Sequence, residues 1–397
     1  MPLLRISSPP TPLEIDLMVE TITHGREQAL PLQHPRTGPS IFNDQKMKLG
    51  LFGSNCSGGL CMTEADTTYE ITWEHTKSIA QKADQLGMEA MVPVARWKGF
   101  GGNVNFNGTN FETFTWAAGL AEATEQITLF TTTHIPTVHP IVAANMAVTN
   151  DHISGGRFGL NLVMGWFPPE MKMFNPDQLP HDERYQYGAE WLEFVEQLWT
   201  AAGEFDFDGK YFQATRCESE PKPLQNPRPV LINAGNSPAG IEFSSRYVDI
   251  NFASLDIEKM PDYTRTVKKK AKDDYQRTIS TMTYGLVVVR DTEAAAKRVH
   301  QEIIDKGDWP GARNLMSAIG MESQSFNEQV EKFQERFIAG WAGMPLVGTP
   351  EQVVEGFQQI SDAGMEGMIM GFLDYNEELD YFGEAVMPLM REAGLRH

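Results

Sequence analysis

Polar side chains interrupt two apolar runs of the sequence, at positions where they could bind a ligand. Asn161 lies within the apolar run 158–164, and Thr132 lies near the end of the run 127–133. A buried amide or hydroxyl group needs a hydrogen-bond partner, because burial without one costs free energy. In an enzyme interior, a bound ligand is one natural partner for such groups.

A third apolar run, 89–95, is followed by two cations that flank an aromatic residue. These residues are Arg96, Trp97 and Lys98, and a glycine cluster comes after them. Cationic groups beside aromatic faces can hold a flat anionic ligand by stacking and ion pairing. The same residues would also suit a basic loop with a flexible turn, and the sequence leaves both interpretations open.

The run 229–235 is followed by the start of a predicted helix. Ser237 is a favoured N-cap residue, and Pro238 is favoured at the first helical position. The free N–H groups and the dipole of such a helix end can bind a phosphate, although a plain capped helix is the commoner case. Arg184 and Tyr185, near the start of another predicted helix, could reach the same phosphate or face solvent.

Several familiar catalytic motifs are missing from the sequence. It has no G-x-G-x-x-G after a strand, no Walker A loop and no H-E-x-x-H motif. Cys56 and Cys61 lack companion ligands at zinc spacing, so we expect no metal site. A phosphate site beside stacking aromatics, without an evident nucleophile, favours a bound cofactor that performs the chemistry. Flavin mononucleotide (FMN), with one phosphate and one flat ring system, fits this description.

The elements that must position these residues alternate along the chain. Short, mostly uncharged runs are typical of strands buried on both faces of a parallel sheet, and amphipathic helices separate them. The predicted strands are 47–52, 89–95, 127–133, 158–164, 229–235, 248–254, 284–290 and 367–373. This alternation predicts an α/β fold, a (β/α)8 TIM barrel, whose active site lies where the strands end.

The barrel domain is expected over residues 46–397, with insertions at 165–228 and 307–348. Residues 1–45 contain seven prolines and no sustained periodicity, so we interpret them as an extended proline-rich arm. The arm could be a disordered tail or could lie over a partner subunit. A short helix is compatible with residues 13–23.

The composition excludes several classes of partner. The chain has 397 residues, with 33 Lys+Arg against 53 Asp+Glu and a net charge of −20. This acidity disfavours nucleic acid and anionic membrane surfaces, and no apolar run is long enough to cross a bilayer. Three cysteines point to a reducing cytoplasm. Arg96, Lys98 and Arg184 would form a locally basic mouth in this acidic protein.

Four motifs together identify a resemblance. They are KLGLF at 48–52, WKGFGG at 97–102, ISGGRFGLNLVMGW at 153–166 and AGNS at 234–237. The chain resembles the bacterial-luciferase-like, flavin-dependent monooxygenases, and within them the branch of the pyrimidine and dimethylsulfone monooxygenases. The similarity covers about residues 46–393, and the block 153–166 is long and specific.

The resemblance implies the residues that bind the cofactor. Flavin contacts of the pyrimidine branch match Ala95, Arg96, Asn161, Glu170, Arg184, Tyr185 and Ser237, with Tyr185 and Ser237 at the phosphate. Asn161 and Thr132 match positions at the ring edge where oxygen reacts, and are the implied catalytic residues. The implied substrate pocket comprises Trp97, Lys98, Phe111, His134 and Trp166, most of which depart from the residues of the pyrimidine branch.

These implications define an expected activity. The chain would be a two-component monooxygenase that takes reduced FMN (FMNH2) from a separate NAD(P)H:flavin reductase. It would use O2, through a flavin peroxide that Asn161 and Thr132 hydrogen-bond, to oxygenate or open a small polar, pyrimidine-like heterocycle. Barrels of this kind commonly pair, so we expect a homo-oligomer.

Other functions remain open at this point. Arg96 and Lys98 offer anion contacts for C–S cleavage of a sulfone or sulfonate, and a deazaflavin-dependent dehydrogenase could use the same barrel. A non-catalytic flavin-binding protein is a further alternative. The joint presence of Asn161, Thr132 and Glu170 disfavours it.

Overall fold

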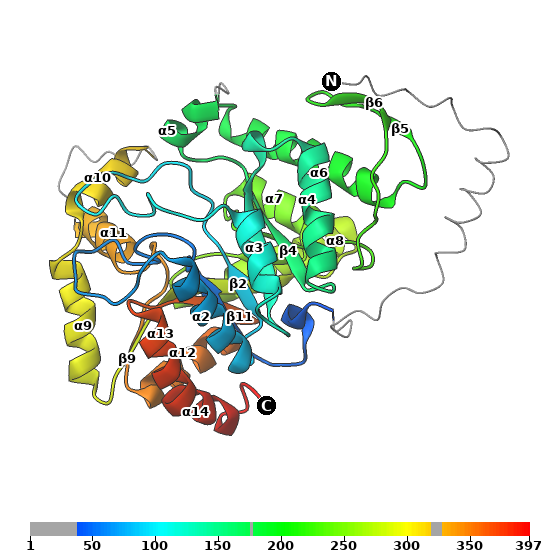
Figure 1. Ribbon diagram of the computed structural model, residues 1–397. Helices are drawn as coiled ribbons and strands as arrows, with labels where there is room; N and C mark the ends of the chain where they lie inside the picture. The colour runs from blue at the N-terminus through cyan, green and yellow to red at the C-terminus, as the bar shows by residue number, and fades with distance from the viewer. Residues whose placement is uncertain (1–37, 175–177, 319–327) are drawn as a thin grey trace, which may run out of the picture. The chain divides into compact units, whose positions relative to one another are not determined.

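The computed structural model describes residues 38–174, 178–318 and 328–397. At its centre, eight parallel strands follow one another in the order β9-β11-β1-β2-β3-β4-β7-β8, and the sheet closes because β8 pairs with β9 (Figure 1). The barrel strands are β1 (Lys48–Phe52), β2 (Ala90–Val92), β3 (Thr128–His134), β4 (Phe158–Val163), β7 (Val230–Asn233), β8 (Ile250–Phe252), β9 (Ser280–Val289) and β11 (Gly367–Gly371). The fold is the predicted (β/α)8 TIM barrel, and every predicted strand is present.

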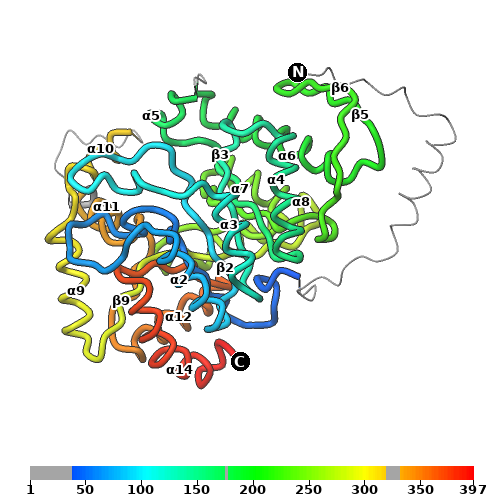
Figure 2. Tube along the Cα trace, in the orientation of Figure 1, coloured from blue at the N-terminus to red at the C-terminus, as the bar shows by residue number. Residues whose placement is uncertain are grey.

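Helices surround the barrel strands (Figure 2). Those that follow the strands are α2 (Trp73–Gln85), α3 (Thr113–Ala121), α4 (Pro140–Ile153), α6 (His181–Thr200), α7 (Pro238–Tyr247), α8 (Met260–Tyr275), α9 (Glu293–Asp305), α12 (Pro350–Asp362), α13 (Tyr375–Tyr381) and α14 (Met387–Glu392). Local sequence fixes several of their starts. Thr349 and Gln352 form a capping box at the start of α12, with Pro350 in the first helical position.

Alternation along the strands decides which side chains enter the barrel. Successive side chains of a strand point to opposite faces of the sheet. On β4, Leu160 and Leu162 pack outward in the main hydrophobic core, against the helices. Asn161 lies between them and therefore points into the barrel. On β3, Phe130 belongs to the interior cluster of the barrel, which places Thr132, two residues later, on the same inward face.

Both predicted insertions carry structure of their own. The first contains α5 (Pro168–Met171), a short 3₁₀ helix at Lys172–Phe174, α6, and the antiparallel hairpin β5 (Phe205–Asp208)–β6 (Gln213–Cys217). The second contains α10 (Trp309–Ala318), α11 (Glu328–Ile338) and β10 (Leu346–Gly348), which pairs with the far end of β9 outside the closed barrel. A third excursion, residues 53–72 between β1 and α2, has no counterpart in the predicted pattern.

The N-terminal end of the barrel is closed by segments from both ends of the described chain. A 3₁₀ helix at Ser40–Phe42 packs there, and the buried Ile41 belongs to the interior cluster. Arg396 forms an ion pair of 2.8 Å with the fully buried Glu89. Residues 1–37, which include most of the predicted arm and the helix considered at 13–23, lie outside the described residues.

Over the described ranges, no helix is both long enough and apolar enough to span a membrane.

Candidate active site

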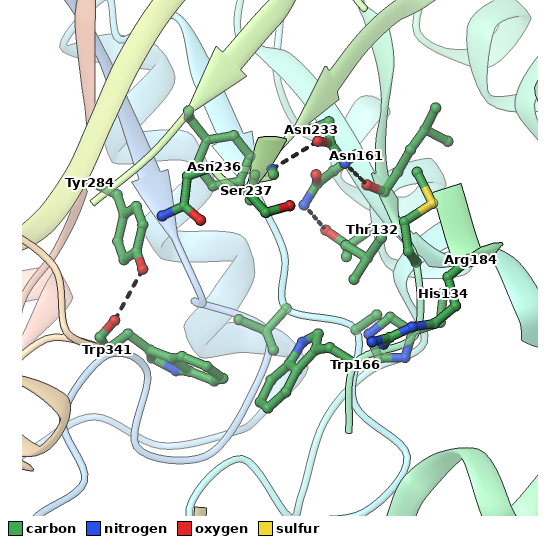
Figure 3. A pocket seen from close by; sticks show the side chains of 18 of the residues that line it. Thr132, His134, Asn161, Trp166, Arg184, Asn233, Asn236, Ser237, Tyr284 and Trp341 are labelled. Carbon is green, nitrogen blue, oxygen red and sulfur yellow. Dashed lines mark hydrogen bonds between the residues drawn. The ribbon is translucent and has the colours of Figure 1, made fainter. Parts of the chain in front are cut away.

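A cavity of about 340 Å3 opens at the C-terminal ends of the barrel strands (Figure 3). The predicted site residues that line it are Ala95, Arg96, Thr132, His134, Asn161, Trp166, Arg184, Tyr185 and Ser237. They come from the ends of β2, β3, β4 and β7 and from the start of α6, so the closure of the barrel brings them together. The cavity has two arginines and two histidines in its wall, and no aspartate or glutamate among its described lining residues.

Asn161 and Thr132 lie side by side on neighbouring strands in the cavity wall. Asn161 Nδ2 donates a hydrogen bond of 3.0 Å to Thr132 Oγ1, whose own hydrogen is donated to the carbonyl of Pro93. Asn161 Oδ1 is buried and has no hydrogen-bond partner among the described residues. A buried acceptor without a partner costs free energy, so this oxygen is available to a donor group of a bound ligand.

One end of the cavity can hold an anion. Ser237 caps α7, and its Oγ accepts a hydrogen bond of 3.2 Å from the backbone N–H of Gly240. A Cβ atom at Gly235 would lie 2.7 Å from the Tyr185 hydroxyl, so the glycine leaves the space that the tyrosine needs. His181 Nε2 lies 3.5 Å from Ser237 Oγ. The helix N-terminus, the hydroxyl groups and the imidazole together suit a phosphate.

Arg184 also lines the cavity. Its Nη1 donates a hydrogen bond of 2.8 Å to the carbonyl of Gly165, while its buried Nε has no partner among the described residues. Burial lowers the pKa of Arg184, yet an arginine stays charged at neutral pH. The residues present therefore fit a flat cofactor with one phosphate, such as FMN.

Glu170 and two basic side chains form a buried cluster behind the cavity wall. Glu170 Oε2 lies 3.2 Å from Arg96 Nη1 and 3.1 Å from His134 Nδ1, and Glu170 and Arg96 are almost entirely buried. Glu170 Oε1 accepts hydrogen bonds from the backbone N–H groups of Trp97 and Lys98. The carboxylate thus positions Arg96 and His134, which line the cavity, while Glu170 itself does not.

Aromatic rings enclose the guanidinium of this cluster. It lies 4.7 Å from the ring centroid of Phe100, 5.3 Å from Trp166 and 5.5 Å from Phe167. Ring faces attract a cation, and the attraction is strongest when the cation is desolvated. Arg96 is therefore held in one orientation by the carboxylate on one side and by the rings around it.

Two pKa shifts of the cluster make the stability of the fold depend on pH. Burial lowers the pKa of His134 below its ordinary value of 6.5, and the nearby Glu170 only partly offsets this. Burial alone would raise the pKa of Glu170, but the hydrogen bond from His134 and the charge of Arg96 outweigh it, so this pKa is lowered. At neutral pH the imidazole is neutral and the carboxylate is charged.

Acidification should therefore destabilise the protein in two steps. Below pH 6.5 the unfolded chain takes up a proton at His134 that the folded protein does not. The free energy of unfolding therefore decreases as the pH is lowered. Below the ordinary Glu value of 4.5, protonation of Glu170 in the unfolded chain adds a second loss of the same sign. Urea unfolding across this pH range measures both steps. His134→Gln should remove the upper step, and an unchanged slope there would contradict the assignment.

The remaining predicted substrate residues lie elsewhere. Trp97 and Phe111 line a neighbouring cavity of about 870 Å3 that also has residues of α3 and α4 in its wall. Because the backbone of Trp97 is bound to Glu170, its ring projects outward and contacts Phe174 with a centroid distance of 5.3 Å. Lys98 is exposed and lines neither cavity. The basic mouth thus contains Arg96 and Arg184 but not Lys98.

Sequence reasoning missed several residues of the cavity wall, among them Asn233, Tyr284 and Trp341. Asn233 accepts hydrogen bonds from the Gly235 N–H and the Ser244 hydroxyl, and so shapes the turn before α7. Asn233 could have been found in the sequence in the same way as Asn161, because it is a polar residue within an apolar run. Tyr284 and Trp341 also line the cavity, and no local pattern marks either of them.

The structure is a TIM barrel whose cavity suits a phosphate-bearing cofactor, and comparison with known proteins identifies its family. The model of the luciferase-like monooxygenases matches residues 47–367. The chain is 32% identical over 354 residues to pyrimidine monooxygenase RutA of Acinetobacter baylyi. The aligned region covers 87% of this chain and 95% of the relative. It is 33% identical over 352 residues to RutA of Pseudomonas syringae, with 87% and 96% covered.

Solved structures agree on the fold. Riboflavin lyase RcaE, determined with a modified FMN and riboflavin, superposes with a TM-score of 0.81 at 21% identity, over 89% of this chain and 93% of its own. Long-chain alkane monooxygenase LadA gives 0.80 at 19% identity, with the same coverage of 89% and 93%. The chain belongs to the luciferase-like monooxygenase family. It is a flavin-dependent monooxygenase.

Proposed function

We propose that this protein is the oxygenase component of a two-component system that uses FMNH2 and O2 to oxygenate or open a small, polar, pyrimidine-like heterocycle. The observation that carries the proposal is the single cavity that combines the anion-binding end at Ser237 with the Asn161–Thr132 pair. When bound, reduced flavin supplies two electrons, so that one oxygen atom of O2 enters the substrate and the other leaves as water. The similarity to pyrimidine monooxygenases supports the substrate class.

The residues of this chain have separate tasks in the proposed reaction. Ser237, Tyr185 and Arg184 hold the phosphate and so fix the position of the cofactor. Asn161 offers its free Oδ1 to groups near the flavin ring, while its Nδ2 holds the Thr132 hydroxyl beside it. Preorganised polar groups of this kind stabilise developing charge without reorganisation. The aromatic rings around Arg96 exclude water from the part of the cavity that they line.

A test of this function supplies the protein with FMN, NADH and a flavin reductase under air. With uracil as substrate, we expect uracil consumption in proportion to NADH oxidation, and an oxygenated product that carries label from ¹⁸O₂. The Asn161→Ala protein is the matched control. Oxidation of NADH that yields only hydrogen peroxide, with uracil and with other pyrimidines and pyridines, would refute the proposal.

A second candidate function rests on the charge of the cavity. Arg96 and Arg184 line it without any carboxylate among the described lining residues, which favours an anionic substrate. C–S cleavage of a small sulfonate would use this charge. Release of sulfite from methanesulfonate in the same assay, without turnover of any heterocycle, would establish this alternative.

The phosphate assignment predicts the effect of charge at Ser237. Ser237→Asp keeps a good N-cap, so α7 should still form, but it places a carboxylate beside the cofactor phosphate. We expect FMN binding, measured by quenching of flavin fluorescence, to weaken roughly tenfold or more, and less so in high salt. Ser237→Asn, which caps without charge, is the matched control. Equal FMN affinity of the two variants would place the phosphate elsewhere.

Three further aspects of the proposal concern the setting of the enzyme. A separate NAD(P)H:flavin reductase would supply FMNH2. The exposed apolar residues Ile141 and Val142 on α4 support association of the chain into a homo-oligomer. The three cysteines are free and buried, which supports work in a reducing compartment such as the cytoplasm.

A further inference from the structure

The loop between α11 and β10 brings an indole into the active-site cavity with an unusual backbone conformation. Trp341 and Ala342, within this loop, have φ angles of 57° and 56°. This left-handed region costs free energy for residues other than glycine and is rare for bulky side chains. Residues stay in it only where surrounding contacts impose it, and such residues cluster at active sites and ligand clamps.

Contacts from several parts of the barrel hold this loop in place. The hydroxyl of Tyr284, on β9, donates a hydrogen bond of 3.1 Å to the carbonyl of Trp341, and the hydroxyl of Ser254 donates to the carbonyl of Ala342. The indole Nε1 of Trp341 donates a bond of 3.1 Å to Oδ1 of Asn107, which is fully buried. The backbone and the ring are thus fixed independently.

Trp341 and Trp166 form two walls of a corner in the cavity, and Figure 3 shows both indoles across the cavity from Asn161 and Thr132. The two ring centroids are 6.2 Å apart and the ring planes meet at 84°. The guanidinium of Arg96 lies near both, 5.3 Å from the centroid of Trp166 and 5.7 Å from that of Trp341. Arg96 Nε has no hydrogen-bond partner among the described residues.

We propose that this corner, formed by Trp341, Trp166 and Arg96, binds the substrate, and that Trp341 is its specificity-determining residue. A flat ring stacks on Trp341 and meets Trp166 with its edge, while Arg96 contacts an oxygen substituent of the ring. Perpendicular walls suit a planar ring, because offset-stacked and edge-to-face contacts are the favoured arrangements of aromatic rings. A tetrahedral molecule such as a sulfone lacks a face to stack. This inference rests on the proposed function, since it assigns a site to the heterocycle.

Binding of uracil to the protein saturated with oxidised FMN tests the corner without relying on turnover. Calorimetry should show that Trp341→Leu weakens uracil binding about tenfold, the amount that loss of one aromatic contact represents. Trp341→Phe keeps a smaller ring and should weaken it about threefold, which keeps the test decisive if the leucine variant fails to fold. Affinity for FMN, from flavin fluorescence, should stay unchanged in both variants.

The matched control is Trp309→Leu. Trp309 belongs to the same insertion as Trp341, but it lines neither the active-site cavity nor its neighbour. It should leave uracil and FMN binding unchanged. Weaker FMN binding with unchanged uracil binding in the Trp341 variants would mean that the corner holds the flavin ring, and would overturn the inference. So would unchanged binding of both, or a wild type that binds dimethyl sulfone but no flat heterocycle. A wild type that binds uracil at the corner but never oxygenates it would refute the proposed function alone.

Discussion

Replacement of Asn161 by alanine is expected to lower kcat by about 10²–10³, the loss that follows removal of one preorganised polar group at a reacting centre. The reason is geometric: Asn161 points into the barrel between two outward leucines and holds Thr132 at 3.0 Å, with a free oxygen in the cavity. The fold should tolerate the change, because the Thr132 hydroxyl remains bonded to the carbonyl of Pro93. We therefore expect a loss of stability of only about 1 kcal/mol.

Steady-state oxygenation of uracil and thermal unfolding measure the two effects of this substitution separately. Asn145→Ala is the matched control, since Asn145 is an exposed asparagine on α4, away from the cavity. It should change neither kcat nor stability. Full activity of Asn161→Ala would remove Asn161 from the catalytic machinery, and a large loss of stability would show that its role is structural.

The second large effect concerns stability. Glu170→Ala should lower the free energy of unfolding by about 3–5 kcal/mol, because Arg96 then remains buried without its carboxylate. The side chains of this pair are 2% and 0% exposed, so water cannot replace the lost partner. The backbone N–H groups of Trp97 and Lys98 lose their acceptor in the same variant. Urea unfolding at pH 7 measures the change, and activity should fall with it because Arg96 and His134 lose their anchor.

An exposed ion pair provides the control for this prediction. Glu302 lies 2.8 Å from Lys306, and both side chains are about half exposed, at 51% and 43%. Glu302→Ala should change stability by about 0.5 kcal/mol or less, because surface pairs contribute little. The double variant Arg96→Met/Glu170→Leu should recover part of the loss, because it removes both charges. Equal effects of Glu170→Ala and Glu302→Ala would show that the buried charge is compensated in another way.

Sequence patterns predicted the fold because the features of a barrel repeat locally. Each strand is a short apolar run, and each is followed by an amphipathic stripe, so neither requires knowledge of distant contacts. The helix start at Ser237 was also predictable, since a cap and a first-position proline are neighbours in the chain. Asn161 was visible as a polar residue in an apolar run, and the period of two of a strand explains its inward direction.

The partners of Arg96 were not visible in this way. Glu170 lies 74 residues further along the chain, and the two meet only because β2 and the segment after β4 end at the same rim of the barrel. Trp97 and Lys98 have residue types suited to a binding site, yet their backbone N–H groups bind Glu170, and their side chains lie outside the cavity. Residue types in the sequence indicated a basic, aromatic site, but contacts between distant parts of the chain determine which of these side chains line the cavity.

The sequence by itself therefore determined the barrel, the start of α7 and the inward amide of Asn161, because short-range periodicity and capping set these features. Tertiary structure alone decided which charges are buried together and which rings face the ligand. Trp341 shows this most clearly: its position depends on Tyr284, Ser254 and Asn107, which are far from it in the chain. Its left-handed backbone is disfavoured locally, so only contacts made in the folded protein can hold it there.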